Sequence, residues 1–316
     1  MKLRNKRLLS ILPGLFIILF LSAINHAGNW SSDPGRAKAK HAALAGQPLQ
    51  ITWQAGQSLN NNCPSGPEVL LPWSNNARFL QAQAKYNAFI AMAAYRTVLH
   101  DPLPGEENNV HLAAGMLCGA VVKPGQVFSQ NNALGPYSRE RGFQPGPVYL
   151  GSKISKTTGG GVCKISSTLY NVAVLADLPI IERHPHGMPV PYVPYGQDAT
   201  VSMGVKDLRF KNNTAHPILI WADAIENTLY IGFYGSSKPP RVTWQHEFFN
   251  SIPAPIIYRY NPLLDKASQK TILEGMEGAA VRSTVLVEHP DGRTEIKSRG
   301  ISYYNPIPAI VERNPL

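Results

Sequence analysis

A run of three glycines leads directly into a cysteine and an apolar segment over Gly159–Asn171, GGGVCKISSTLYN, and no other stretch constrains the fold as much. Beyond the cysteine, apolar residues recur at roughly helical spacing, at Ile165, Leu169, Val172 and Leu175. Glycines adopt backbone conformations that residues with a Cβ resist, so they suit a tight loop. The pattern therefore predicts a glycine loop followed by a helix that holds Cys163 in its first turn.

The position of Cys163 at the start of a helix has a chemical consequence. A first turn carries unpaired N–H groups and the positive end of the helix dipole, which favour a thiolate, and the thiolate is the nucleophile. We expect the N–H groups of Gly159, Gly160 and Gly161, with those of the first turn, to hold a developing oxyanion. The alternative is that Cys163 is a small buried apolar residue and the glycines form an ordinary turn.

Two histidines follow this helix in the segment Glu182–Gly187, ERHPHG. Pro185 favours an extended chain, and alternate residues of a strand share a face, so His184 and His186 are predicted to point toward the helix. One would be the general base for the Cys163 thiol and the other would orient a substrate, because a Cys–His pair needs proximity only in space. Alternatively, the two histidines are structural and bond nearby carbonyl groups.

A carboxylate and two tyrosines complete the candidate site. Asp198 precedes an alternating stretch, Ala199–Met203, that predicts a strand, and it is the candidate to orient a histidine as a triad carboxylate does. A turn or capping role for Asp198 is the alternative. Tyr192 and Tyr195 lie among prolines and are expected to shape the wall of a substrate groove.

Charge and short motifs narrow the possible partners. The net charge of +10 favours a polyanionic partner such as a bacterial wall or an anionic membrane surface. No block of basic residues interleaved with aromatic ones resembles a nucleic-acid module, so nucleic acid is not an expected partner. No CxxC or HExxH pattern is present, so neither a metal site nor a cofactor is predicted.

The start of the chain predicts export. A basic segment, Lys2–Arg7, precedes an apolar run, Leu8–Ile24, so residues 1–27 are expected to be a signal peptide or a signal anchor. Residues 28–72 contain turn-forming residues and an Ala/Lys stretch, which suit a tether. The protein is therefore expected outside the cytoplasm, either secreted or anchored to the membrane.

The sequence contains three cysteines, Cys63, Cys118 and Cys163. In an exported chain an odd number leaves one thiol over. Either a Cys63–Cys118 disulfide with Cys163 free, or three reduced thiols, is compatible with this count.

Periodicity divides the remaining chain into a main domain and a tail. Apolar residues spaced near 3.6 predict a helix over Asn76–Leu99 and a shorter one over Asn109–Cys118. Extended segments are predicted over 121–128 and 144–150, and an antiparallel meander from 208 to 235. We therefore expect an α+β fold, with N-terminal helices packed on a β-rich domain over residues 73–235.

The tail, residues 236–316, is predicted to be a Pro-rich connection followed by a small C-terminal all-β module. A turn at Asp291–Gly292 joins two alternating segments into a hairpin. A module this small lies near the lower limit for folding alone, so it is expected to be an accessory and not a second active site.

Several segments within residues 108–235 carry a family resemblance. They are, in order, KPGQVFSQNNALG, RGFQPGPVYLGSK, GGGVCKISSTLYN, ERHPHGMPV, YVPYGQDATVS and LRFKNNTAHPILI. On these segments the chain resembles the VanW family, named from vancomycin-resistance gene clusters. The resemblance implies an exported, wall-associated protein, and some members act as L,D-transpeptidases that cross-link peptidoglycan with a cysteine nucleophile. By this match Cys163 is the nucleophile, His184 and His186 fall on the histidine segment, and Asp198 falls on the GxDATVS segment.

Two positions depart from the family pattern. Lys164 stands where the family usually has Gln, and Gly187 where it usually has Ser. If the Gln helps to bind an oxyanion, Lys164 either replaces it with a charge or marks lost activity.

The leading hypothesis is a cysteine acyl-transferase that acts on peptidoglycan stem peptides. A second is a non-catalytic peptidoglycan- or glycopeptide-binding module linked to vancomycin resistance, in which Cys163 serves packing and the region Tyr192–Tyr195 forms the contact surface. A third is hydrolysis of the stem by a carboxypeptidase-like enzyme.

Overall fold

The computed structural model describes residues 49–51, 65–99, 102, 104–150 and 153–315. The expected leader, most of the tether and Cys63 lie outside the described residues. The helices are α2 (Ala77–Tyr86), α3 (Pro104–Leu117), α4 (Gln130–Leu134) and α5 (Cys163–Leu175), with a 3₁₀ turn η2 (Arg139–Arg141). Among the described residues, no helix combines the length and the apolar character needed to cross a membrane.

The strands make up the larger part of the regular structure, which confirms the α+β prediction. They are β1 (Leu49–Ile51), β2 (Gly66–Pro67), β3 (Ile90–Val98), β4 (Val121–Val122), β5 (Val127–Ser129), β6 (Pro145–Leu150), β7 (Lys153–Thr158), β8 (Ile180–Glu182), β9 (Arg209–Lys211), β10 (Ile218–Ile225), β11 (Thr228–Gly235), β12 (Arg241–Ile252), β13 (Ile256–Tyr260), β14 (Gln269–Leu273), β15 (Gly278–Glu288), β16 (Thr294–Tyr304) and β17 (Ala309–Arg313).

A five-stranded antiparallel sheet in the order β2-β3-β11-β10-β4 is the base of the main domain. Both of its faces are covered. Ile218 and Ile220 of β10 join the core formed with α3 and α5, whereas Leu219 and Trp221 join a second cluster with Phe79 of α2. This explains why the first five residues of β10, Ile218–Ala222, are a continuous apolar run, since both sets of alternating side chains are buried there.

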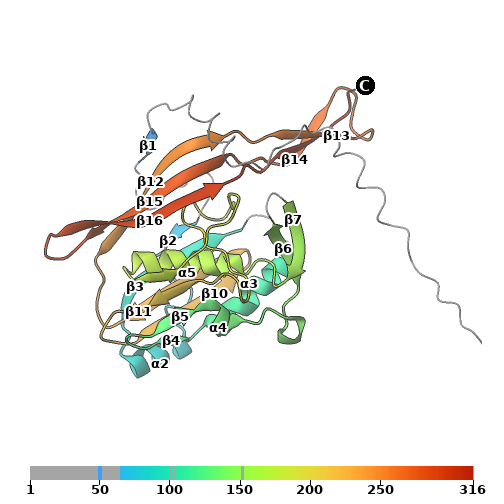
Figure 1. Ribbon diagram of the computed structural model, residues 1–316. Helices are drawn as coiled ribbons and strands as arrows, with labels where there is room; N and C mark the ends of the chain where they lie inside the picture. Colours follow the sequence, from blue (N-terminus) through green and yellow to red (C-terminus); the bar gives the residue numbers. More distant parts are fainter. Residues whose placement is uncertain (1–48, 52–64, 100–101, 103, 151–152, 316) are drawn as a thin grey trace, which may run out of the picture. The chain divides into compact units, whose positions relative to one another are not determined.

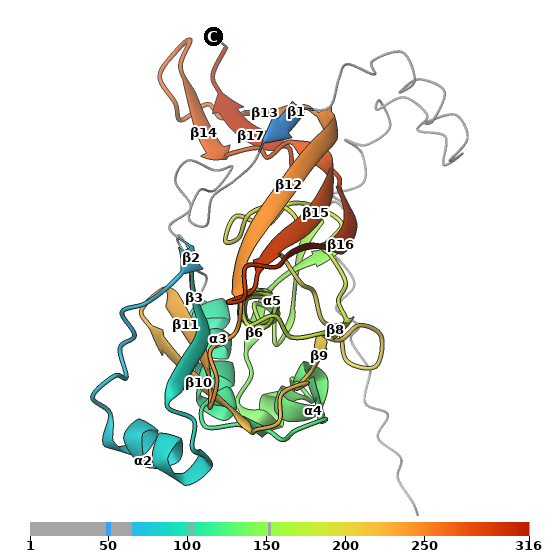
Figure 2. The ribbon, with the colours of Figure 1, turned by 90° about the vertical axis from the view of Figure 1, so that its left-hand side faces the viewer.

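Helix α5 carries the predicted cysteine at its first residue and lies against the sheet (Figure 1). Its residues from Lys164 to Val174 are all buried. The same helix also lies beside the long strand β12 (Figure 2). The Tyr170 and Trp244 rings of these two elements lie 5.7 Å apart. Helix α5 is therefore enclosed between two β structures.

The C-terminal strands form two sheets. The first has the order β1-β12-β15-β16, and the second has the order β13-β17-β14 with β13 and β17 parallel. Val242 and Trp244 of β12 and Val285 and Val287 of β15 belong to the same core as α5 and β10. The main hydrophobic core therefore continues across residue 235 and does not end where the tail was predicted to begin.

The predicted helix Asn76–Leu99 is wrong over its second half. Helix α2 ends at Tyr86 because Asn87 adopts a left-handed conformation, φ 51°, and caps it. The chain then forms β3, which pairs with β11 along its whole length. The Ala-rich sequence of β3 reads as helical, but strand pairing in the sheet outweighs local propensity.

Smaller differences concern the strands and the second helix. Ala199–Met203 is not a strand, since it contributes only one isolated bridge, between Ser202 and Lys206. Strand β9 does not extend the β10–β11 hairpin, because it pairs with β5 and β8 in a separate sheet. Helix α3 starts earlier than predicted, at Pro104, a residue whose fixed φ suits a first helical turn.

We expect the tail and the main domain to unfold together, because they share a core. Val285→Ala removes two methyl groups from a side chain with 0% exposure in that core, so it should lower the free energy of unfolding by about 2 kcal/mol. Urea denaturation followed by tryptophan fluorescence and by circular dichroism should show one coincident transition. The control is Ile296→Ala on the neighbouring strand, where the side chain is 67% exposed and the expected loss is below about 1 kcal/mol. Two separate transitions, with only one affected by Val285→Ala, would contradict the shared core.

Candidate active site

The sulfur of Cys163 lies at the N-terminus of α5 against the segment that follows Asp198. Its Sγ is 3.3 Å from Thr200 Oγ1, and the backbone N–H of Val201 donates to the sulfur at 3.5 Å. The residue is partly exposed, unlike the next eleven residues of the helix, which are buried. An exposed edge, hydrogen-bond donors and the positive end of the helix dipole are together the environment of a reactive thiol.

The pKa of the Cys163 thiol lies below its ordinary value. Burial alone would raise this pKa, but a hydrogen bond with the His186 ring and the positive charge of that ring lower it further than burial raises it. Thr200 and the backbone of Val201 act in the same direction. Electrostatics therefore favour the thiolate form, which is the nucleophilic one.

His186 is buried, with 5% exposure, and connects Cys163 to Asp198. Its Nδ1 lies 2.6 Å from Asp198 Oδ2, and its backbone N–H donates to the same oxygen at 2.7 Å. With Nδ1 on the carboxylate, Nε2 is the ring nitrogen that remains for the sulfur. Burial lowers the pKa of His186, but the hydrogen bonds with Asp198 and Cys163 raise it to about 9. Cys163, His186 and Asp198 thus form a chain in which the His186 ring is hydrogen-bonded to Asp198 at one end and electrostatically coupled to the Cys163 thiol at the other.

Asp198 is only 1% exposed, so its charge must be compensated inside the protein. Arg183 Nη2 lies 2.9 Å from Oδ1, and the Tyr304 hydroxyl donates to the same oxygen at 2.5 Å. Burial raises the pKa of this carboxyl, but Arg183 and the hydrogen bond with His186 hold it well below its usual range. The carboxylate is therefore ionised and oriented, which goes beyond the turn or capping role considered as its alternative.

His184 does not share this environment. Its Nε2 lies 3.1 Å from Glu182 Oε1 and its side chain is 38% exposed. The prediction that both histidines face the helix assumed a strand, but β8 ends at Glu182 and the following residues are irregular. The structure thus brings only His186 to the cysteine.

Lys164 is directed away from the sulfur. Its side chain is buried, and Nζ donates to the carbonyl oxygen of Asn227 at 2.9 Å, in the turn between β10 and β11. Burial lowers its pKa to about 8, while Glu106 and Glu107 raise it. An oxyanion role for Lys164 is therefore wrong, because consecutive helical residues point in different directions.

The glycine loop packs closely against neighbouring segments, so not all of its N–H groups are free to bind an oxyanion. Gly159 N donates to Gln144 O and Gly160 N to Thr157 O, both at 3.0 Å. A Cβ at Gly160 would collide with the backbone of Gly146, and a Cβ at Gly161 would meet Glu106 Cγ at 2.6 Å. The prediction of an oxyanion site is therefore wrong for the first two glycines.

Two amides remain as candidates for that task. In the described part of the chain, the N–H groups of Gly161 and Cys163 form no hydrogen bond. The amide of Cys163 belongs to the nucleophile itself, a position from which it can face a tetrahedral intermediate.

The two tyrosines do not form a groove wall. Tyr192, with 4% exposure, is part of the main core. Tyr195 packs its ring against Phe248 and Tyr304, with centroids at 5.8 and 5.2 Å, and its hydroxyl donates to Glu277 O at 2.6 Å. Both side chains therefore serve packing, and Tyr195 does so against the C-terminal strands.

Sequence reasoning missed Arg183, Thr200 and Tyr304. Arg183 directly precedes His184, and Thr200 follows Asp198 by two positions, so closeness in the sequence to predicted site residues could have indicated both. Tyr304 stands 106 positions from Asp198, and nothing local marks it. On the question of a disulfide, Cys118 and Cys163 carry free thiols, whereas Cys63 lies outside the described residues.

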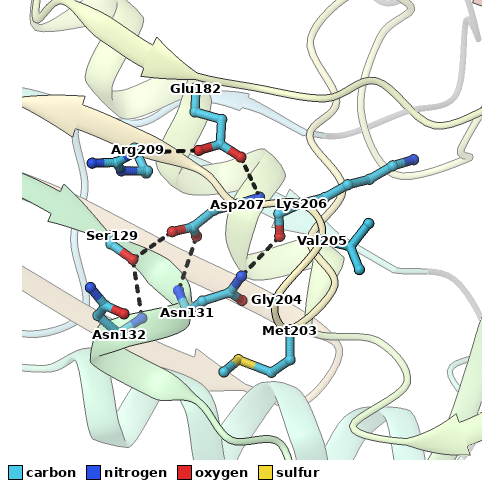
Figure 3. A pocket seen from close by; sticks show the side chains of 10 residues that line it. All are labelled: Ser129, Asn131, Asn132, Glu182, Met203, Gly204, Val205, Lys206, Asp207 and Arg209. Carbon is cyan, nitrogen blue, oxygen red and sulfur yellow. Dashed lines mark hydrogen bonds and ion pairs between the residues drawn. The ribbon is translucent and has the colours of Figure 1, made fainter.

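A polar pocket of about 400 Å³ lies beside the loop that follows Val201. Figure 3 shows its lining side chains, among which Asp207 points toward Ser129 and Asn131. Asp207 Oδ2 accepts from Ser129 Oγ at 2.5 Å and Oδ1 accepts from Asn131 N at 3.0 Å. The pocket begins two residues beyond Val201, whose backbone contacts the Cys163 sulfur, so it is a candidate place for a bound substrate.

Comparison with known proteins gives a family and two relatives. Residues 105–234 match the family model described as VanW like protein. Over 145 residues the chain is 37% identical to the uncharacterized protein YoaR of Bacillus subtilis (strain 168), covering 46% of this chain and 48% of that protein. Over 142 residues it is 30% identical to the vancomycin B-type resistance protein VanW of Enterococcus faecalis (strain ATCC 700802 / V583), covering 43% and 51%. The chain thus spans about half the length of the curated relatives it matches.

Among solved structures, the chain is similar to the IgA1 protease G5 domain. The match has 22% sequence identity and a TM-score of 0.15, and it covers 25% of this chain and 96% of that domain. A TM-score this low does not establish a common fold.

The rate of Cys163 alkylation as a function of pH can show which of the two histidines lowers the pKa of the thiol. His186→Gln keeps a donor for Asp198 but cannot carry the imidazolium charge, so the inflection should rise to the ordinary thiol value of 9.0 or above. Less thiolate should then be present at pH 7, and alkylation there should be slower. Mass spectrometry of the iodoacetamide-treated Cys163 peptide measures the rate. His184→Gln is the control and should keep the low inflection; identical profiles for the two variants would refute the assignment.

The close packing of the glycine loop predicts an unequal response to alanine. Gly160→Ala should lower the free energy of unfolding by about 2 kcal/mol or more, because the added methyl group meets backbone that cannot rotate away. Gly115→Ala in α3 has open space around the Cβ position and should stabilise the protein by about 0.5–1 kcal/mol. Urea unfolding measures both, and a neutral Gly160→Ala would show that the loop is free to move.

Proposed function

Since residues 105–234 form a domain of the VanW family, we propose that this chain is a cysteine acyl-transferase of the L,D-transpeptidase type that acts on peptidoglycan stem peptides. The observation that carries the proposal is the Cys163–His186–Asp198 chain, in which Asp198 holds the His186 ring by a hydrogen bond and that ring lowers the pKa of the Cys163 thiol. A partly exposed thiol next to a buried imidazole, itself oriented by a carboxylate, is the arrangement of nucleophilic acyl transfer.

In the first half of the reaction, the Cys163 thiolate attacks the carbonyl carbon of the residue that precedes the terminal residue of a donor stem. The tetrahedral oxyanion faces the N–H of Cys163. The C–N bond then breaks, and the protonated His186 donates its Nε2 proton to the departing amine. The products are a thioester on Cys163 and the released terminal amino acid.

In the second half, an acceptor attacks the thioester carbonyl. A side-chain amine of a neighbouring stem loses its proton to His186, forms the new amide and releases the cysteine, which gives a cross-link. Water in place of the amine gives a shortened stem. Asp198 acts through His186 in both halves, because it fixes the ring orientation and stabilises the imidazolium.

The proposed substrate also suggests where the protein acts. Peptidoglycan stems lie outside the cytoplasmic membrane, which agrees with the leader expected over residues 1–27, either cleaved or retained as an anchor. The net charge of +10 suits binding to an anionic wall or membrane surface. We place the donor stem in the polar pocket lined by Asn131, Met203 and Asp207, next to the loop that contacts the sulfur.

The test is incubation of the protein with tetrapeptide muropeptides, followed by mass spectrometry of intact protein and of products. We expect an acyl adduct at Cys163 and a cross-linked dimer, and both should be lost in Cys163→Ala. The control is Cys118→Ala, which removes another half-buried free thiol and should keep the adduct.

The outcomes separate the competing functions. A shortened stem without dimer would assign hydrolysis instead of transfer. Absence of any adduct, with wall pull-down equal in the parent and in Cys163→Ala, would overturn the enzymatic proposal and favour a non-catalytic module that binds peptidoglycan or glycopeptides.

A further inference from the structure

The loop that carries Asp198 is held by the C-terminal strands. Tyr304, the last residue of β16, is 3% exposed, and its hydroxyl makes two contacts with this loop. It donates to Asp198 Oδ1 at 2.5 Å and accepts from the backbone N–H of Gly196 at 2.8 Å. One hydroxyl group therefore fixes both the carboxylate and the backbone two residues before it.

A second residue of β16 holds the other partner of the carboxylate. Arg183 Nη1 donates to Ser302 Oγ at 2.8 Å, while Nη2 and Nε reach Asp198 Oδ1 and the Asp198 carbonyl at 2.9 and 2.7 Å. Ser302 and Tyr304 are two positions apart on a strand, so they share a face. This face of β16 is complementary to the ion pair between Arg183 and Asp198.

Two neighbouring strands of the same sheet also contact this loop. A Cβ at Gly196 would collide with Ser283 of β15 and would lie 3.1 Å from His246 Nδ1 of β12. His246 Nε2 in turn lies 3.0 Å from the side-chain nitrogen of Gln197. Burial and the charge of Arg183 lower the pKa of His246 to about 4, so this contact adds no charge beside the carboxylate.

We propose that Tyr304 is a positioning residue for the Cys163–His186–Asp198 chain, and that the C-terminal strands are consequently part of the catalytic apparatus. The inference rests on the proposed function and adds a required group from outside the domain that carries the nucleophile. Tyr304 acts only through Asp198: its hydroxyl keeps Oδ1 fixed, so that Oδ2 stays aligned with His186 Nδ1.

The effect of removing the Tyr304 hydroxyl on the Asp198 carboxylate depends on the other charged and titratable groups around it. Arg183 and His186 face the carboxylate from the preceding segment, and Tyr304 faces it from β16. Without the hydroxyl, Oδ1 keeps only Arg183, and the Gly196 N–H loses its acceptor, so the loop can shift. A shifted carboxylate supports the imidazolium less well, and the thiolate loses part of its stabilisation.

The test uses Tyr304→Phe in the full chain, because phenylalanine keeps the ring that packs against Tyr195. We expect alkylation of Cys163 at pH 6 to slow by about tenfold and its inflection to move upward, as loss of a hydrogen bond to a charged group implies. Tyr303→Phe is the matched control, since this neighbouring ring is 66% exposed and faces away from the loop. Its profile should match the parent. Equal profiles for parent, Tyr304→Phe and Tyr303→Phe would overturn the inference.

A second readout keeps this inference separate from the proposed function. In protein with ¹⁵N-labelled histidine rings, the Nδ1–H signal of His186, assigned by its loss in His186→Gln, reports the bond to Asp198 without any substrate. Tyr304→Phe should shift or broaden this signal, while Tyr303→Phe should leave it unchanged. If the parent forms no muropeptide adduct, the proposed function fails, yet an altered signal in Tyr304→Phe still supports the positioning role. An unaltered signal overturns that role whatever the enzymatic result.

Discussion

The carboxylate of Asp198 is a charged group buried away from water. The structure around it is determined by how the free-energy cost of this burial is offset. Removal of an unpaired carboxylate from solvent would cost several kcal/mol, so each of its lone pairs needs a partner. Arg183 and Tyr304 bind one oxygen, and the ring and backbone of His186 bind the other. Arg183 and His186 lie in the same segment as Asp198, whereas Tyr304 comes from a distant strand, so the full set of partners exists only when the C-terminal strands have docked. Folding of the tail and assembly of the site are thereby coupled.

The Cys163 environment distinguishes a reactive thiol from a structural one. A structural cysteine is sealed among apolar side chains, which raises its pKa. Here the residue is partly exposed, its sulfur contacts a hydroxyl and a backbone N–H, and the His186 imidazole lowers the pKa of the thiol. His186 and Asp198, by contrast, are both almost fully buried. The charged base is therefore shielded from water while the nucleophile remains accessible, which is the combination that acyl transfer requires.

Features determined by residues close together in the sequence could be predicted, whereas features that depend on contacts between distant segments could not. The glycine loop and the helix starting at Cys163 were correctly predicted because glycine, apolar spacing and helix start all lie within a dozen residues. The choice between His184 and His186 was not predictable, because it depends on where β8 ends. Asp198 was found from its triad-like position, but Tyr304 could not be, since only the docking of β16 brings it near. Similarly, β3 has an Ala-rich sequence that favours a helix, and only its pairing with β11 makes it a strand.

The position of Lys164 bears on the departure from the family pattern. A lysine beside the nucleophile would change the electrostatics of the site if its charge reached the sulfur or the developing oxyanion. Instead the ammonium group lies under the β10–β11 turn, bonded to Asn227 O. Consecutive residues on a helix are separated by about 100°, so position 164 faces the sheet whenever position 163 faces the loop of Thr200. Lys164 therefore links α5 to the β10–β11 turn, and its departure from Gln is no argument against the proposed chemistry at Cys163.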